Sequence, residues 1–130
     1  MKKLLTLLAL GGFILFTSGC IGTTEGDLQN GTWKLVQFDT SVPNVEFNFK
    51  SNGLVIYKNL DVMTIDTGTY TPTASIEHRY IEILGLPIDT TQELETYNGK
   101  WTIIKLDESS LIIAIPKQGN GIIQREFENI

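Results

Sequence analysis

Beyond its N-terminus, the chain alternates between apolar and polar side chains over short segments that turn signals separate. The clearest segment is 45–50, where Val45, Phe47 and Phe49 alternate with polar neighbours, which predicts a strand with one buried face. Ser51-Asn52-Gly53 follows, and Asn and Gly accept the positive φ of tight hairpin turns. The same reasoning predicts eight strands, over residues 32–39, 45–50, 54–58, 67–72, 77–84, 100–107, 111–116 and 122–128.

Composition and connection lengths predict an all-β fold. Residues 20–130 contain only two Ala but many Ile, Val and Thr, and β-branched residues favour strands over helices. Eight successive strands in this length are typical of an antiparallel up-and-down barrel, with a β-sandwich as the alternative. An immunoglobulin-like sandwich lacks support because the Cys–Trp–Cys pattern is missing. The two longest connections are predicted at 59–66 and 85–98, and loops of this length are often functional.

The N-terminus reads as a secretory signal. Lys2 and Lys3 precede a charge-free, mostly apolar run from Leu4 to Phe16, and small or polar residues follow it. The run has 13 residues, whereas a helix that spans a bilayer needs about 20. We therefore expect residues 1–19 to be a signal peptide and not a permanent transmembrane anchor.

The single cysteine lies at the end of this signal. Thr17-Ser18-Gly19-Cys20 resembles the lipobox of bacterial lipoproteins, in which the residue three before the Cys is usually Leu. The resemblance implies cleavage before Cys20 and acylation of its thiol, with palmitate-type chains that bind the membrane. An ordinary signal peptide is the alternative, but it would leave an unpaired thiol open to oxidation. Ile21 follows in place of Asp, which by the same resemblance implies the outer membrane, on its periplasmic face or the cell surface.

Length and charge limit the remaining possibilities. The chain has 130 residues, which is enough for one domain. We predict a polar, Gly-rich tether over residues 20–30 and a β-barrel domain over 31–130. Without residues 1–19 the chain keeps eight Lys and Arg against fifteen Asp and Glu, a net charge of −7. This charge disfavours nucleic acid and anionic lipid headgroups as direct partners.

The start of the predicted domain carries a second resemblance. Asn30-Gly31-Thr32-Trp33 resembles the Gly-x-Trp motif that opens the first strand of lipocalins, and residues 99–113 are similar to the C-terminal half of small bacterial lipocalin-like lipoproteins. The resemblance covers about residues 30–128. It implies that Trp33 packs at the closed end of the barrel and that Arg125, from the last strand, lies across the indole as a cation–π partner.

Asn-Gly-x-Trp occurs a second time, at 98–101. An internal duplication would explain this echo. We favour a shared structural device, in which a loop ends in Asn-Gly and the next strand buries a Trp.

No set of residues indicates catalysis. The nucleophile motif Gly-x-Ser-x-Gly, a Gly-rich phosphate loop and an Asp-rich calcium loop are absent, and His78 is the only histidine. One cysteine and one histidine allow neither a disulfide within the chain nor a His cluster for a metal. We therefore expect a non-enzymatic protein without a metal or other cofactor.

Two hypotheses about function remain open. In the first, the barrel binds a small apolar ligand. The aromatic side chains expected to line its cavity are Phe47, Phe49 and Tyr57, with polar ends from Tyr70 and Tyr80. In the second, the barrel core is filled, and the domain is a protein–protein interaction or inhibitor module of the outer membrane that works through its loops.

Overall fold

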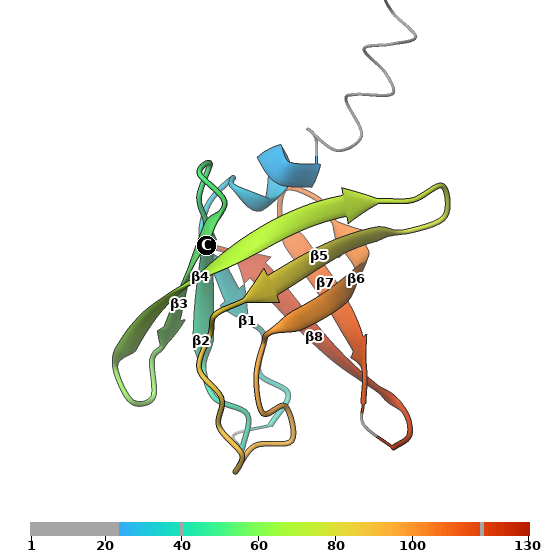
Figure 1. Ribbon diagram of the computed structural model, residues 1–130. Helices are drawn as coiled ribbons and strands as arrows, with labels where there is room; N and C mark the ends of the chain where they lie inside the picture. Colours follow the sequence, from blue (N-terminus) through green and yellow to red (C-terminus); the bar gives the residue numbers. More distant parts are fainter. Residues whose placement is uncertain (1–23, 40, 118) are drawn as a thin grey trace, which may run out of the picture.

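The computed structural model describes residues 24–39, 41–117 and 119–130. Eight antiparallel strands form a closed up-and-down barrel, in which each strand pairs with its neighbours in sequence and β8 pairs with β1 (Figure 1). This confirms the all-β barrel and excludes the sandwich. The strands are β1 (Trp33–Leu35), β2 (Val45–Phe49), β3 (Leu54–Asn59), β4 (Thr64–Ala74), β5 (Arg79–Leu84), β6 (Gly99–Leu106), β7 (Ser110–Pro116) and β8 (Ile122–Asn129).

The barrel interior follows the alternation in the sequence. On β2 the side chains of Val45, Phe47 and Phe49 are buried, while their neighbours Glu46 and Asn48 are only partly buried. Strands on every side contribute in the same way, because successive side chains of a strand point to opposite faces of the sheet. The fully buried large side chains include Trp33, Trp101, Phe47, Phe127, Ile81, Ile83 and Leu111. The centre of the barrel is therefore packed with side chains.

Two strands, β1 and β4, differ from the predictions by three residues or more at one end, and the other strands differ by one or two residues. β1 spans only three residues, because after Leu35 the chain leaves the barrel into an irregular loop that Gln37 braces through a bond from its Nε2 to the Val42 carbonyl (2.7 Å). β4 begins at Thr64, so the β3–β4 connection is the tight turn 60–63 and not a long loop. Met63 takes a φ of 58° in this turn. The sequence offers no glycine there, and the polar turn residues are Asn59 and Asp61, of which the Asp61 amide donates a hydrogen bond to Asn59 Oδ1 (3.0 Å).

A short helix over residues 24–28 covers one end of the barrel (Figure 1). Thr24 and Leu28 are buried, and the Leu28 carbonyl accepts a hydrogen bond from Trp33 Nε1 (2.8 Å). Gln29 Nε2 donates to the hydroxyl of Tyr70 (2.9 Å), which itself donates to a carbonyl of the β2–β3 turn (2.6 Å). Residues 24–30 are thus part of the domain, which corrects the prediction that the tether extends to residue 30. We call this the helix-capped end.

The two Asn-Gly-x-Trp segments build the same local structure. Gly31 and Gly99 adopt φ values of 117° and 134°, in the region that favours glycine. Trp101 Nε1 donates to the Tyr97 carbonyl (2.8 Å), as Trp33 donates to Leu28. In each case the residue that offers the carbonyl is itself buried. The shared structural device is therefore confirmed. In each segment a buried Trp donates a hydrogen bond to the carbonyl of a second buried residue, Leu28 or Tyr97, which we call the plug residue of that end.

Candidate binding site at the open end of the barrel

Four connections gather at the end of the barrel opposite the helix, which we call the open end (Figure 1). They are residues 36–44, 60–63, 85–98 and 117–121. Between the first three lies a cavity of about 690 Å³, within the usual range of roughly 300–1,000 Å³ for small-molecule sites. The side chains that shape it include Val42, Tyr57, Leu86, Leu94, Tyr97 and Arg125.

Tyr97 forms the floor of this cavity. Its side chain enters the barrel from the 85–98 connection and is buried. The ring centroid lies 5.0 Å from that of Phe47, 5.8 Å from that of Tyr57 and 5.8 Å from that of Trp101. Aromatic rings at these distances make favourable edge and offset contacts. The interior below Tyr97 is thus occupied, and the cavity is a cup at the mouth of the barrel.

Short-range hydrogen bonds hold the 85–98 connection in this shape. Asn98 closes it at its base, because its Oδ1 accepts from the Leu86 amide (2.7 Å) and its Nδ2 donates to the Leu86 carbonyl (2.8 Å). Further out, the Asp89 amide donates to the Glu95 carbonyl (2.6 Å). Lys117 from the β7–β8 connection donates to Glu93 Oε1 (3.0 Å) and so links that connection to the 85–98 connection.

Acidic side chains dominate the electrostatics of the cup. Asp66, Asp89, Glu93 and Glu95 line it, and Arg125 is the only cation among its lining residues. Hydrogen bonds from the hydroxyl and amide of Thr91 lower the pKa of Asp89, and the ammonium of Lys117 lowers that of Glu93. Both carboxylates therefore stay charged at neutral pH. The cup has an aromatic floor and a negatively charged wall.

Burial raises the pKa of both tyrosines in the floor of the cup, Tyr57 and Tyr97. The nearby Arg125 acts in the opposite direction on the pKa of Tyr97. The charges of Asp66, Asp89 and Asp61 add to the increase in the pKa of Tyr57. Both phenols are therefore neutral hydrogen-bonding groups at physiological pH.

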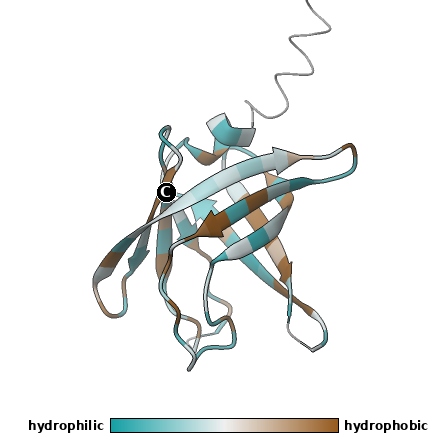
Figure 2. Cartoon of the chain, viewed as in Figure 1, coloured by the Kyte–Doolittle hydropathy of each residue, from teal (hydrophilic) through white to brown (hydrophobic). Residues whose placement is uncertain are grey.

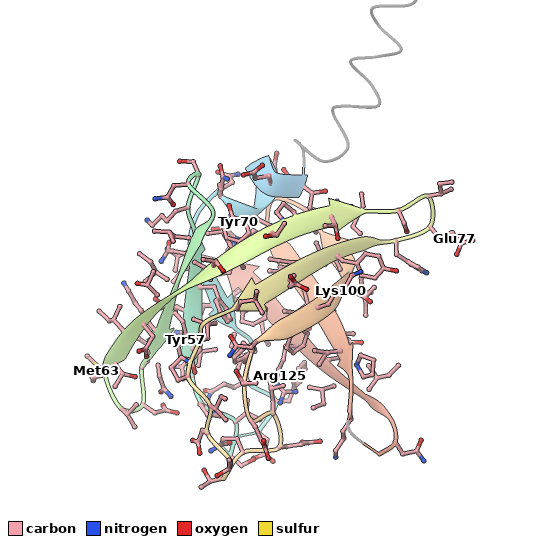
Figure 3. All side chains as sticks on the ribbon, viewed as in Figure 1. Tyr57, Met63, Tyr70, Glu77, Lys100 and Arg125 are labelled. Carbon is pink, nitrogen blue, oxygen red and sulfur yellow. The ribbon has the colours of Figure 1, made fainter. Side chains whose placement is uncertain are left out.

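The predicted lining residues are distributed over the whole barrel. Tyr57 lines the cup, and Phe47 lies directly beneath it, 5.5 Å from Tyr57 between ring centroids. Phe49 and Tyr70 instead pack against each other (5.0 Å) next to the helix, where Tyr70 takes part in the helix contacts (Figure 3). These two residues do not line the cup, because their positions on β2 and β4 place them toward the helix-capped end.

The prediction that Tyr80 lines a cavity is wrong. On β5, Ile81 and Ile83 are buried, so Tyr80 belongs to the face of the strand that points out of the barrel. There the Nζ of Lys100, from the adjacent strand β6, lies 4.5 Å above the Tyr80 ring.

The predicted contact between Arg125 and Trp33 is also corrected. In the register of β1 and β8, Trp33 pairs with Asn129. Arg125 lies four residues earlier on β8, or roughly 14 Å along the strand, and lines the cup beside Tyr97. Figure 3 shows it near Tyr57 and away from the helix. Trp33 does pack at the closed end, where its partner is the Leu28 carbonyl.

Three further residues line the cup that were not predicted from the sequence: Tyr97, Leu86 and Leu94. A signal for Tyr97 did exist, since it directly precedes the second Asn-Gly-x-Trp segment. The 85–98 connection was correctly expected as a long one, and three of its acidic residues line the cup. Leu86 and Leu94 lack regular spacing, so their burial depends on how the connection folds back.

Several expectations lie outside the part of the chain that the structure describes. The signal peptide 1–19, Cys20 and residues 21–23 belong to this group. Among the described residues, no helix is long and apolar enough to cross a membrane. Within the same ranges, no three His, Cys, Asp or Glu side chains come together as a metal site would require.

The fold and the cup define the class of structure, a closed eight-stranded barrel with an aromatic-floored cup at one end. Comparison with known proteins gives no closer assignment, because no family model, curated protein or solved structure matches the chain.

Proposed function

We propose that this protein is a lipid-anchored binding protein of the bacterial cell envelope, and that the cup at the open end holds its ligand. The observation that carries the proposal is the cavity of about 690 Å³ floored by Tyr57 and Tyr97. Its size suits a small, partly apolar molecule.

The charge of the cup selects among such molecules. Four carboxylates and one guanidinium line it, so an anionic ligand such as a fatty acid would meet repulsion. A neutral or cationic ligand would find an aromatic floor and a favourable potential. We therefore propose an uncharged or positively charged ligand with an aromatic or aliphatic body.

The position of the proposed anchor supports this arrangement. Cys20 precedes Thr24 by four residues, and four extended residues span at most about 14 Å. Thr24 lies in the helix at the helix-capped end. Acyl chains on Cys20 would therefore hold that end near the membrane, and the cup would face away from it.

A matched pair of fluorescent probes tests the ligand. The protein, purified from the membrane fraction and placed in phosphatidylcholine nanodiscs, is titrated with N-phenyl-1-naphthylamine, which is neutral, and with its sulfonated analogue 1-anilinonaphthalene-8-sulfonate. We expect saturable binding of the neutral probe and affinity for the sulfonate that is lower by about tenfold or more. Tyr57→Ala should abolish the saturable component, whereas Tyr80→Ala, on the outer face, should retain it. Equal signals from both variants would show that the probe binds elsewhere.

The anchor has a separate test. Cys20→Ala removes the proposed acylation site, so we expect the protein to move from the membrane fraction to the soluble fraction. A Cys20→Ala protein that still sediments with membranes would refute the lipid anchor and leave the cup unaffected.

A further inference from the structure

Large apolar side chains are exposed at the open end of the barrel, three on the connections beside the cup and one at the start of β8. Phe38 is 76% exposed, Met63 80%, Ile88 66% and Ile122 72%. They come from four different connections or strand starts at the open end, and Figure 2 shows brown segments in the β3–β4 turn and the 85–98 connection. One exposed apolar residue is ordinary, but several around one mouth mark an interaction surface. We call these four residues the rim.

The β3–β4 turn shows that the rim residues occupy unusual positions. Tight turns favour Gly, Asn, Asp and Ser, yet this turn presents Val62 and Met63 to solvent. Met63 adopts a φ of 58°, in the left-handed region that bulky residues avoid. Figure 3 places Met63 next to the start of β4, pointing away from the barrel. Neither local preference nor core packing accounts for an apolar side chain here.

The turns of the helix-capped end provide the contrast. The β2–β3 turn consists of Ser51, Asn52 and Gly53, and the β6–β7 turn of Asp107, Glu108 and Ser109. The carboxylate of Asp107 accepts hydrogen bonds from the amides of Ser109 and Ser110, as in an ordinary polar turn. Apart from Ile76 in the β4–β5 hairpin, these turns present polar side chains.

Charge identifies the partner. Inside the rim lie Asp66, Asp89, Glu93 and Glu95, and Lys117 is already paired with Glu93. A second copy of this chain would oppose its own negative charges, and an anionic bilayer would be repelled as well. A protein segment that carries Lys or Arg between apolar residues would match both the rim and the acidic cup.

We infer that the open end is a docking surface for a basic, apolar segment of a second protein, with the rim supplying apolar contact and the cup supplying charge. The inference rests on the exposed rim and does not require the small ligand of the proposed function. It also does not require acylation of Cys20.

Two short labelled peptides of equal length test it, one composed of Lys, Ile and Ser and the other of Glu, Ile and Ser, both in non-amphipathic order. The protein in phosphatidylcholine nanodiscs is titrated with each by fluorescence anisotropy, and empty nanodiscs are titrated in parallel. We expect saturable binding of the basic peptide that weakens as salt rises, and no saturable binding of the acidic one. Binding of both, or of neither, would overturn the inference.

Variants locate the contact. Phe38→Ser combined with Met63→Ser should weaken binding of the basic peptide by about tenfold or more. Ile104→Ser is the matched control, because Ile104 is 55% exposed but lies on β6, outside the rim. If the rim variant and the control bind equally, the rim is not the docking surface. Neither Phe38 nor Met63 lines the cup. The double variant should therefore still bind N-phenyl-1-naphthylamine, and this result separates the docking surface from the ligand site of the proposed function.

Discussion

The two ends of the barrel use the same closing motif with different consequences. At each end an Asn-Gly-x-Trp segment buries a tryptophan, and the indole donates to a carbonyl 2.8 Å away. At one end that carbonyl belongs to Leu28, in a short helix that lies across the barrel. At the other it belongs to Tyr97, at the end of the long 85–98 connection. The motif plugs the barrel in both places.

What differs is the segment that precedes the motif. The helix over 24–28 is compact, and Gln29 and Tyr70 bond it to the barrel, so little space remains above Leu28. The 85–98 connection arches away before it returns at Asn98, and the space under the arch is the cup. The comparison indicates that closing the barrel and forming a cavity depend on different features. The Asn-Gly-x-Trp motif closes the barrel, and the length of the segment before it decides whether a cavity remains.

The strongest test of the shared motif removes each tryptophan. Trp33→Ala and Trp101→Ala should each lower the free energy of unfolding by about 3–5 kcal/mol, because both side chains are fully buried. Urea denaturation followed by far-UV circular dichroism measures both. Trp33→Phe and Trp101→Phe keep most of the side-chain volume and should lower the free energy of unfolding by less than the alanine variants. If one alanine variant is near neutral, the two ends are not equivalent in closure.

A second test asks whether the helix is part of the domain. Leu28→Ala should lower the free energy of unfolding by about 2–5 kcal/mol, as expected for a buried leucine. Ile76→Ala, at a fully exposed position, is the control and should stay within about 0.5 kcal/mol of the native protein. If Leu28→Ala leaves the free energy of unfolding unchanged, the helix does not stabilise the domain, and residues 24–30 act as a tether, as predicted from the sequence.

The amount that the sequence could predict also differs between the ends. Strand alternation, as in Val45, Phe47 and Phe49, predicted the barrel because period-two burial needs only neighbouring residues. Leu28 follows polar, Gly-rich residues and has no periodic partner, so its burial depends on contacts with distant strands. Arg125 could not be placed, because its position relative to Trp33 depends on the β1–β8 register, and the two residues are far apart in sequence.

The cup shows the same limit. The 85–98 connection and its acidic residues were visible in the sequence, but the place of Tyr57 in the cup was not. The alternation of Ile81 and Ile83 with Tyr80 and Glu82 already assigns Tyr80 to the outer face of β5. Which end of the barrel Tyr57 approaches depends on the direction and pairing of β3, which the sequence does not give. A one-residue change of register moves a side chain to the other face of the sheet.

A third test separates the two asparagines of the motif. Asn98 makes two hydrogen bonds with the Leu86 backbone, so Asn98→Ala should lower the free energy of unfolding by about 1–3 kcal/mol. Asn30 is exposed, and only its main-chain carbonyl accepts a hydrogen bond from the Asn129 side chain. Asn30→Ala should therefore change the free energy of unfolding by less than about 0.5 kcal/mol. Urea midpoints compare the two directly. Equal losses would mean that the asparagine acts in the same way at both ends.

The smallest effect concerns the plug of the open end at high pH. Burial raises the pKa of Tyr97 above its ordinary value, which is about 10 in an unfolded chain. Above that pH the unfolded chain loses its phenolic proton while the folded protein keeps it, so the unfolded state binds fewer protons and stability falls as pH rises. Tyr97→Phe removes this contribution. Urea midpoints measured from pH 8 to pH 11 (roughly the window around that value) should therefore decline less steeply for Tyr97→Phe than for the native protein. An unchanged decline would mean that the Tyr97 phenol ionises as freely in the folded state as in the unfolded state, and that the open end is wetter than the helix-capped end at its plug.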